Sequence, residues 1–144
     1  MNKVVTLDGL DIYQKNFQQI LIRGDGRENF NKIIKENLSV SPPSKNLEVT
    51  NTNKYLFAKS SFDQWNLLYL EKQEYNNILI NISKLNKVDE ILATDYSYGQ
   101  VYFEVIGKNK DQFLNKLTQF DLRPKKFPFN SMAQTLIARI ECSI

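Results

Sequence analysis

The sequence predicts an α+β fold in which two overlapping split β-α-β units form antiparallel sheets that carry helices on one face. Three observations support this prediction. Short runs with period-two alternation recur along the chain, as expected of strands. Three segments with helical periodicity separate these runs. Proline and polar turn residues lie between the two kinds of segment, and together they predict the element order β-α-β-β-α-β-β-α-β.

The first predicted elements are a strand and a helix. The β-rich run 19–23 is followed by Asp25 and Glu28, whose spacing of three predicts a capping box at a helix start. The proline pair at 42–43 ends this helix and opens a loop. Its apolar stripe consists of Phe30, Ile33, Ile34 and Leu38.

The middle of the chain is expected to contain two hairpins separated by a helix. Alternation predicts strands over 54–59 and 65–70, which we expect to pair as a hairpin. Apolar residues at helical spacing predict a helix over 74–85. Strands over 89–94 and 101–106 flank a turn and are expected to form the second hairpin.

A third helix and a closing strand complete the prediction. Asn109 and Gln112 are spaced as the cap and third residue of a helix that ends near Asp121. From Thr135 the apolar residues follow a period of two, which predicts one strand to the end of the chain. The inward face of that strand is expected to carry Leu136, Ala138, Ile140 and Cys142.

The expected domain organisation is simple. Residues 1–17 are polar with scattered apolar positions, and we expect them to form an extended N-terminal arm. Residues 18–144 are expected to form one domain with two halves, about 18–87 and 88–144. A chain of 144 residues buries enough surface to fold without disulfides.

The composition excludes several classes of function. The 144 residues contain no histidine, which excludes Ser-His-Asp and Cys-His catalysis and histidine-dependent zinc and iron sites. Cys142 is the sole cysteine, and no secretory leader opens the chain, so we expect a cytoplasmic protein. No apolar run approaches the roughly 20 residues of a membrane span. We expect no catalytic, cofactor-binding or metal-binding residues on this chain.

Charge argues against a nucleic-acid partner. The net charge is only +3, and basic and acidic residues alternate along most of the chain. The one basic cluster, Arg123–Lys126, has only three positive charges and no set of clustered aromatic positions for stacking bases, so an acidic protein surface is a better partner for it than a nucleic acid. The segment Gly24–Gly26 lacks the third glycine of a dinucleotide fingerprint, and a strand-to-helix turn explains its glycines.

Two residues have both a functional and a structural interpretation, and a third has a structural one alone. Asp95 could hold a substrate through its carboxylate, but Asp95, Ser97 and Gly99 are also the residues that a tight turn requires, and we favour the turn. Trp65 could stack on a pterin ring, but a lone tryptophan on an alternating strand is more often a core or interface residue. Cys142 is most simply a small buried apolar residue.

Our candidate partner interface lies around a proline-containing loop. Phe127 and Phe129 flank Pro128, and large apolar side chains in a loop either fold back on the core or contact a partner. We assign Phe127, Phe129, Met132 and Trp65 to this hypothetical interface.

The second half of the chain has a distinctive order of turn, strand, helix and loop. Its segments are Asp95–Gly99 (DYSYG), the strand ending at Gly107, the helix with Phe113 and Leu114, Asp121-Leu122, Phe127-Pro128 and Ser131–Thr135 (SMAQT). This order resembles the gamma subunit of heterotetrameric sarcosine oxidase. Residues 60–70 and the strand at 20–23 resemble that family more loosely, so the resemblance covers about 18–142. The chain departs from the family's usual Gly-Pro at Ser61-Phe62, and from its Gly-Ser-Cys at 130–132.

The resemblance implies a non-catalytic subunit with a fold distantly similar to the folate-binding domain of the glycine-cleavage T protein. In such complexes sarcosine is oxidatively demethylated to glycine, and the one-carbon unit passes to tetrahydrofolate. The resemblance also implies that FAD, FMN, NAD and tetrahydrofolate are bound by partner subunits. The gamma chain is expected to dock on the alpha subunit, within a complex that also contains beta and delta subunits.

Two hypotheses therefore remain open. The first is a structural subunit of a sarcosine oxidase complex, which requires an exposed apolar surface. The second is a stand-alone folate-binding or one-carbon-transfer protein of the aminomethyltransferase type. It requires an acid such as Asp95 and an aromatic residue in one small cavity.

Overall fold

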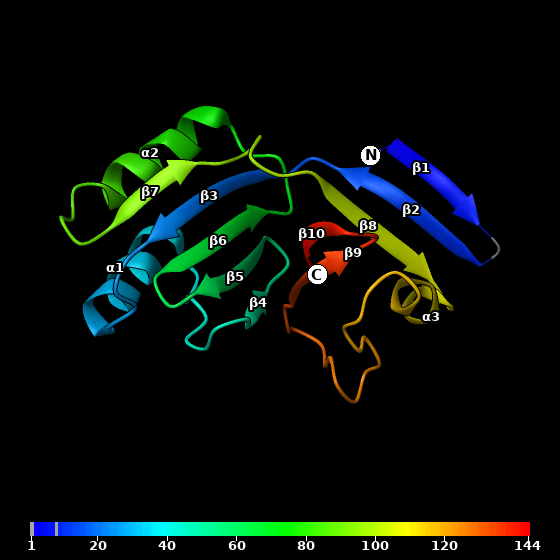
Figure 1. Ribbon diagram of the computed structural model, residues 1–144. Helices are drawn as coiled ribbons and strands as arrows, with labels where there is room; N and C mark the ends of the chain where they lie inside the picture. The colour runs from blue at the N-terminus through cyan, green and yellow to red at the C-terminus, as the bar shows by residue number, and fades with distance from the viewer. Residues whose placement is uncertain (1, 8) are drawn as a thin grey trace. The chain divides into compact units, whose positions relative to one another are not determined.

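The computed structural model describes residues 2–7 and 9–144, and these divide into two compact units. Phe17–Gln100 form the first, which we call the central unit. Met1–Asn16 and Val101–Ile144 form the second, which we call the terminal unit. In Figure 1 the terminal unit combines the blue start of the chain with its yellow-to-red end. Both units have antiparallel sheets and few helices, which confirms the predicted mixed α+β class.

The central unit is a five-stranded antiparallel sheet with two helices. Its elements are β3 (Gln18–Arg23), α1 (Glu28–Leu38), β4 (Val49–Asn51), β5 (Tyr55–Ser61), β6 (Gln64–Tyr69), α2 (Tyr75–Leu85) and β7 (Leu92–Asp95). The strand order is β4-β5-β6-β3-β7, so β6 lies between β5 and β3. Ile22 of β3 stands opposite Trp65 of β6 on one side and Ala93 of β7 on the other. This register places the apolar residues of three strands on one face.

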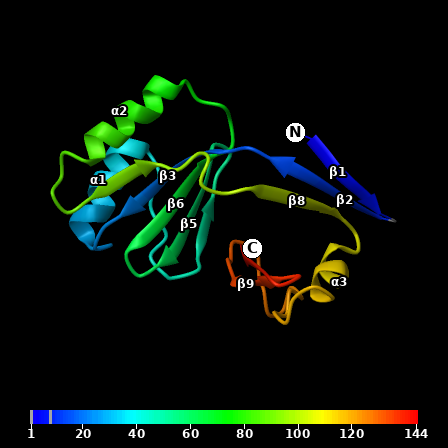
Figure 2. The same ribbon diagram turned by 45° about the horizontal axis from the view of Figure 1, so that its top comes forward.

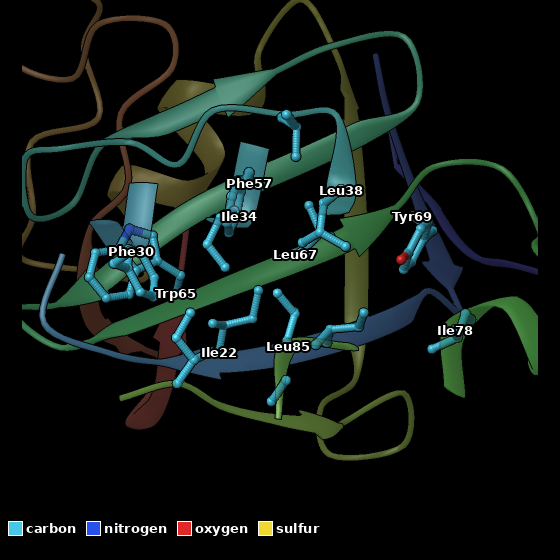
Figure 3. Close-up of a cluster of buried hydrophobic side chains, with 14 residues drawn as sticks. Ile22, Phe30, Ile34, Leu38, Phe57, Trp65, Leu67, Tyr69, Ile78 and Leu85 are labelled. Atoms are coloured by element: carbon cyan, nitrogen blue, oxygen red, sulfur yellow. The ribbon is translucent and has the colours of Figure 1, made fainter. Parts of the chain in front are cut away.

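The core of the central unit lies between that face and the two helices (Figure 2). Figure 3 shows Phe30, Ile34 and Leu38 of α1 among the strand residues. The predicted stripe of α1 is therefore the face that packs on the sheet, and it contributes three of the buried residues. Ile78 and Leu85 of α2 complete the same cluster. The two predicted helices and the hairpin of β5 and β6 are confirmed.

Two local details of the central unit differ from the sequence prediction. The expected capping box does not form. Helix α1 begins at Glu28, so Arg27 and not Asp25 is the N-cap residue, and no side chain makes a cap hydrogen bond. Asp25 instead accepts a hydrogen bond from the backbone N–H of Arg27, 2.9 Å away, and so shapes the turn before the helix. The short strand β4 was not predicted, since three residues are too few to show alternation.

The terminal unit consists of a three-stranded sheet, a short helix and a separate hairpin. Its elements are β1 (Asn2–Leu7), β2 (Leu10–Lys15), β8 (Tyr102–Gly107), α3 (Lys110–Asn115), β9 (Gln134–Ile137) and β10 (Ile140–Ser143). The strand order β1-β2-β8 is antiparallel throughout. β9 and β10 pair only with each other within the described residues.

The structure corrects the expected N-terminal arm and the second expected hairpin. Residues 2–7 and 10–15 are strands β1 and β2, and β2 pairs with β8 rather than projecting into solvent. β7 does not pair with β8, because β7 adds to the edge of β3 in the central unit. The division into units therefore falls at 16/17 and 100/101 instead of near residue 87. Pairings between segments about 90 residues apart leave no local signal in a sequence.

The closing strand is also corrected, because it is a hairpin. Ala138 and Arg139 have φ values of 49° and 71°, as in the two-residue turns that join hairpin strands. The turn reverses the alternation, so Leu136 and Ile140 are exposed while Thr135, Ile137 and Cys142 are half-buried. Helix α3 is shorter than predicted, and Asn109 makes no side-chain cap hydrogen bond. The side chain of Asn115 instead accepts from the backbone N–H of Leu122 and fixes the chain after the helix.

Candidate partner interface

The Asp95 carboxylate is occupied by its own turn. Its Oδ1 atom accepts from Ser97 Oγ at 2.6 Å and from Ser97 N at 3.1 Å. Partial burial acts to raise the pKa of Asp95, but the hydrogen bonds from Ser97 and from the Tyr75 hydroxyl outweigh it and lower this pKa. Ser97 Oγ in turn accepts from the backbone N–H of Gln19, 3.0 Å away. Asp95 therefore ties the end of β7 to β3 and α2, as a structural turn residue does.

Trp65 belongs to the core of the central unit and is not part of an interface. It is fully buried, and its Nε1–H donates to the carbonyl oxygen of Pro43 at 2.9 Å. Its ring lies 4.6 Å from the Phe30 ring (Figure 3), and the Lys59 ammonium lies 4.7 Å from its centroid. These contacts bury the apolar ring and give its N–H group a hydrogen-bond acceptor. The assignment of Trp65 to the partner interface is therefore wrong, because core packing has enclosed it.

The other three predicted interface residues lie in the terminal unit and differ in exposure. Phe127 is half-buried, and its ring meets the ring of Phe120 edge-on at 5.5 Å. Met132 is half-buried. Phe129 is 94% exposed. Only Phe129 of these residues presents most of its side chain to solvent.

The terminal unit buries little apolar surface of its own. Among the described residues, its fully buried apolar side chains are Leu10, Leu122 and Ala133, whereas the central unit has sixteen. Its exposed large apolar side chains are Val4, Val5, Leu7, Val101, Phe103, Ile106, Leu117, Phe129, Leu136 and Ile140. Soluble monomers rarely expose so many apolar residues on so small a unit. The apolar residues of the terminal unit are therefore too exposed to form a complete hydrophobic core within the unit.

One face of the terminal sheet carries its ion pairs, and the other carries most of its apolar residues. On one face Lys3 pairs with Asp11 and Lys15 pairs with Glu104, each at 2.8 Å, as expected of a solvated surface. The register places apolar residues on the other face. These are Val5, Leu7, Leu10, Ile12, Phe103 and Val105. The prediction of an arm over residues 1–17 did not include this apolar face, although Val5 and Leu7 already alternate with Thr6.

The net positive charge of the protein also lies in the terminal unit. The central unit has ten basic and ten acidic residues, and residues 1–16 have two of each. Residues 101–144 have seven basic and four acidic residues, which accounts for the whole net charge of +3. The unit that exposes most apolar surface for its size is therefore also the cationic one.

Neither a metal centre nor a membrane span emerges from the described part of the chain. Over residues 2–7 and 9–144, no group of three or more Cys, Asp or Glu side chains is placed to hold a metal ion. None of the helices in these ranges has the length and apolar character needed to cross a bilayer. The turn at Gly24–Gly26 has its own packing reason for glycine, because a Cβ on Gly26 would lie 3.0 Å from the Trp65 ring.

Comparison with known proteins identifies a shared fold. No family model matches the chain, and no curated protein matches it. Among solved structures, the chain is similar to a chain of the heterotetrameric sarcosine oxidase from Corynebacterium sp. U-96, determined in complex with pyrrole 2-carboxylate. The TM-score is 0.82 at 16% sequence identity, and the match covers 98% of this chain and 72% of that one. At this identity the likeness establishes the fold: nearly all of the chain folds as a chain of that heterotetramer does.

Proposed function

We propose that this chain is a non-catalytic subunit of a heterotetrameric sarcosine oxidase complex and corresponds to its gamma subunit. The observation that carries the proposal is the terminal unit, whose described residues include ten exposed large apolar side chains and only three buried ones. A second protein that covers this surface would complete its core. The fold match to a chain of a heterotetramer supports the same conclusion.

The roles of the other subunits in the proposed complex are those that the resemblance to the sarcosine oxidase family implies. The turn at Gly24–Gly26 lacks the third glycine of a dinucleotide fingerprint, which supports the proposal that other subunits bind the flavins. We propose that the alpha, beta and delta subunits carry FAD, FMN, NAD and tetrahydrofolate, and that this chain docks on alpha. The oxidative demethylation of sarcosine, with transfer of the one-carbon unit to tetrahydrofolate, then takes place in the cytoplasm on those subunits.

The finer fold assignment belongs to the same proposal. In the central unit, β6 is inserted between β3 and β5, and β3 is inserted between β6 and β7. This interleaving supports a split β-α-β arrangement that is distantly similar to the folate-binding domain of the glycine-cleavage T protein.

The alternative of a stand-alone folate-binding protein loses the two residues on which it depended. The Asp95 carboxylate already accepts from Ser97 and Tyr75, and Trp65 is fully buried with its Nε1–H bonded to Pro43. The Asp95 carboxylate is therefore engaged in its own turn, and the Trp65 ring is not accessible to a pterin.

Co-purification from the native cell tests the proposed function. A tagged copy of the chain should retain larger subunits in fixed stoichiometry, with the absorption spectrum of bound flavin. The isolated complex should consume oxygen when sarcosine is added. Recovery of the chain alone, monomeric and colourless, would contradict the proposal, and titration with tetrahydrofolate would then test the alternative.

A further inference from the structure

The chain between α3 and β9 contains a loop, residues 121–130, whose first half is fixed by hydrogen bonds. We call it the Phe129 loop. At its start Arg123 donates to both carboxylate oxygens of Asp121, from Nε at 2.8 Å and from Nη2 at 2.6 Å. The backbone N–H groups of Lys126 and Phe127 both donate to the carbonyl oxygen of Arg123, at 2.8 and 2.9 Å. These bonds close a helical turn at residues 123–127.

The turn is also attached to the body of the terminal unit. Leu122 is 5% exposed, and its N–H donates to Asn115 Oδ1 at 3.0 Å. The ring of Phe127 meets that of Phe120 nearly at right angles, a favourable aromatic geometry. Beyond the turn, Asn130 has a φ of 59°, which bends the chain back toward β9. Side chains thus hold the loop before Phe129, and backbone hydrogen bonds between Ala133 and Ile144 hold the chain after it.

Phe129 is exposed on this ordered loop. Its side chain is 94% exposed, whereas Phe127, two residues earlier, packs inward. An aromatic side chain has few rotatable bonds, and when the backbone before it is already held, little conformational entropy is lost on binding; such residues dominate many interfaces. The geometry therefore favours Phe129 as a binding residue over Phe127 and Met132.

The charged residues beside Phe129 indicate what kind of partner surface would bind it. Asp121 neutralises Arg123, and the side chains of Lys125 and Lys126 are exposed, with no ion pair to an acidic side chain in the described part of the chain. The rest of the terminal unit adds further positive charge. A second copy of this chain would bring a terminal unit of the same sign or a neutral central unit, so charge complementarity points to a different protein with acidic groups.

We propose that the Phe129 loop docks Phe129 into an apolar pocket on a larger partner protein, with carboxylates on the pocket rim that meet Lys125 and Lys126. The inference deepens the proposed function, because the partner is then the subunit that binds this chain in the complex. Phe129 supplies the affinity, and the two lysines supply orientation and a faster association rate.

The test uses the partner recovered with the tagged wild-type chain, purified and identified by its mass and flavin spectrum. Binding is measured with Phe129→Ala and with the double variant Lys125→Glu and Lys126→Glu. The matched controls are Phe62→Ala, which removes a 76% exposed phenylalanine from the central unit, and Lys54→Glu with Lys87→Glu, which makes the same charge change there. Circular dichroism confirms that each variant is folded.

The expected result is a loss of affinity that is specific to the loop. Phe129→Ala should weaken binding at least about tenfold, mainly through faster dissociation. The double lysine variant should slow association by about tenfold at low salt, and the difference should shrink at high salt. Both controls should bind like the wild type.

The other outcomes separate this inference from the proposed function. A flavin-containing partner that binds Phe129→Ala as tightly as the wild type overturns the inference and leaves the proposed function intact. A partner without flavin that still requires Phe129 and the lysines overturns the proposed function and supports the inference. Self-association through Phe129 overturns the inference because the occupant is then a second copy, and a chain that binds no partner overturns both.

Discussion

The guanidinium of Arg123 and the carboxylate of Asp121 form two hydrogen bonds, of 2.8 and 2.6 Å, across only two positions of the chain. The backbone N–H of Arg123 also donates to Asp121, at 3.1 Å. The bidentate geometry makes this pair more specific than an ordinary surface ion pair. It sets the direction in which the Phe129 loop leaves the body of the terminal unit.

This pair predicts a strongly acidic titration. The side-chain and backbone hydrogen bonds from Arg123 lower the pKa of Asp121 to about 2, against about 3.9 for a free aspartate. Because the folded pKa is the lower one, the pair's contribution to stability is present above about pH 4 and is lost as the pH falls through about 2. NMR titration of the Asp121 carboxyl carbon measures this pKa. In Arg123→Gln it should move up toward the ordinary value, and an unchanged pKa would show that the pair does not form in solution.

Removal of the Trp65 side chain should destabilise the central unit. Trp65→Ala leaves a large cavity beside Phe30 and removes the donor to Pro43, so the free energy of unfolding should fall by about 3–5 kcal/mol. Urea denaturation followed by circular dichroism measures the change. Phe62→Ala is the control, since Phe62 is 76% exposed and its loss should change stability by about 0.5 kcal/mol or less. Equal effects of the two substitutions would contradict the core assignment.

Gly107 should tolerate no side chain. It has a φ of 148°, and a Cβ there would lie 2.1 Å from the carbonyl oxygen of Gly9, a backbone atom that cannot turn aside. Gly107→Ala should therefore break the pairing of β8 with β2 and cost more than about 2 kcal/mol. Hydrogen exchange should show lost protection in β2 and β8 and retained protection in β3 and β6. Wild-type protection of β2 in Gly107→Ala would show that this close approach is absent.

The turn of the last hairpin is a site for stabilisation. Ala138 and Arg139 both have positive φ, a conformation that side chains with a Cβ disfavour and that an Asn-Gly pair accommodates well. The double substitution Ala138→Asn with Arg139→Gly should therefore raise the free energy of unfolding of the terminal unit by about 1 kcal/mol. Thermal unfolding measures the gain. Ala138→Val should have the opposite effect, and a loss of stability in the double variant would mean that the turn has another geometry.

Local sequence signals predicted the elements of the central unit well. The stripe from Phe30 to Leu38 is the buried face of α1, and the alternation of Trp65, Leu67 and Tyr69 is the core face of β6. Each of these patterns reflects the contact of one element with a single apolar layer. The same local reasoning failed for residues 2–15, whose strands depend on β8 far along the chain.

The candidate interface was also predicted only in part. The sequence identified Phe127, Phe129, Met132 and Trp65 as large apolar residues that needed a contact. Their spacing could not show that Phe127 meets Phe120 while Phe129 meets solvent, because exposure depends on which neighbours the fold supplies.

The sequence by itself determined the α+β class, both helices of the central unit, the absence of histidine chemistry and the resemblance that led to a multisubunit oxidase. The tertiary structure alone decided that the two ends of the chain form one unit, that Trp65 is enclosed and that Phe129 is exposed. The physical reason is that periodicity records how one element faces its surroundings. Long-range pairing and burial depend on the combined packing of segments that are far apart in the chain.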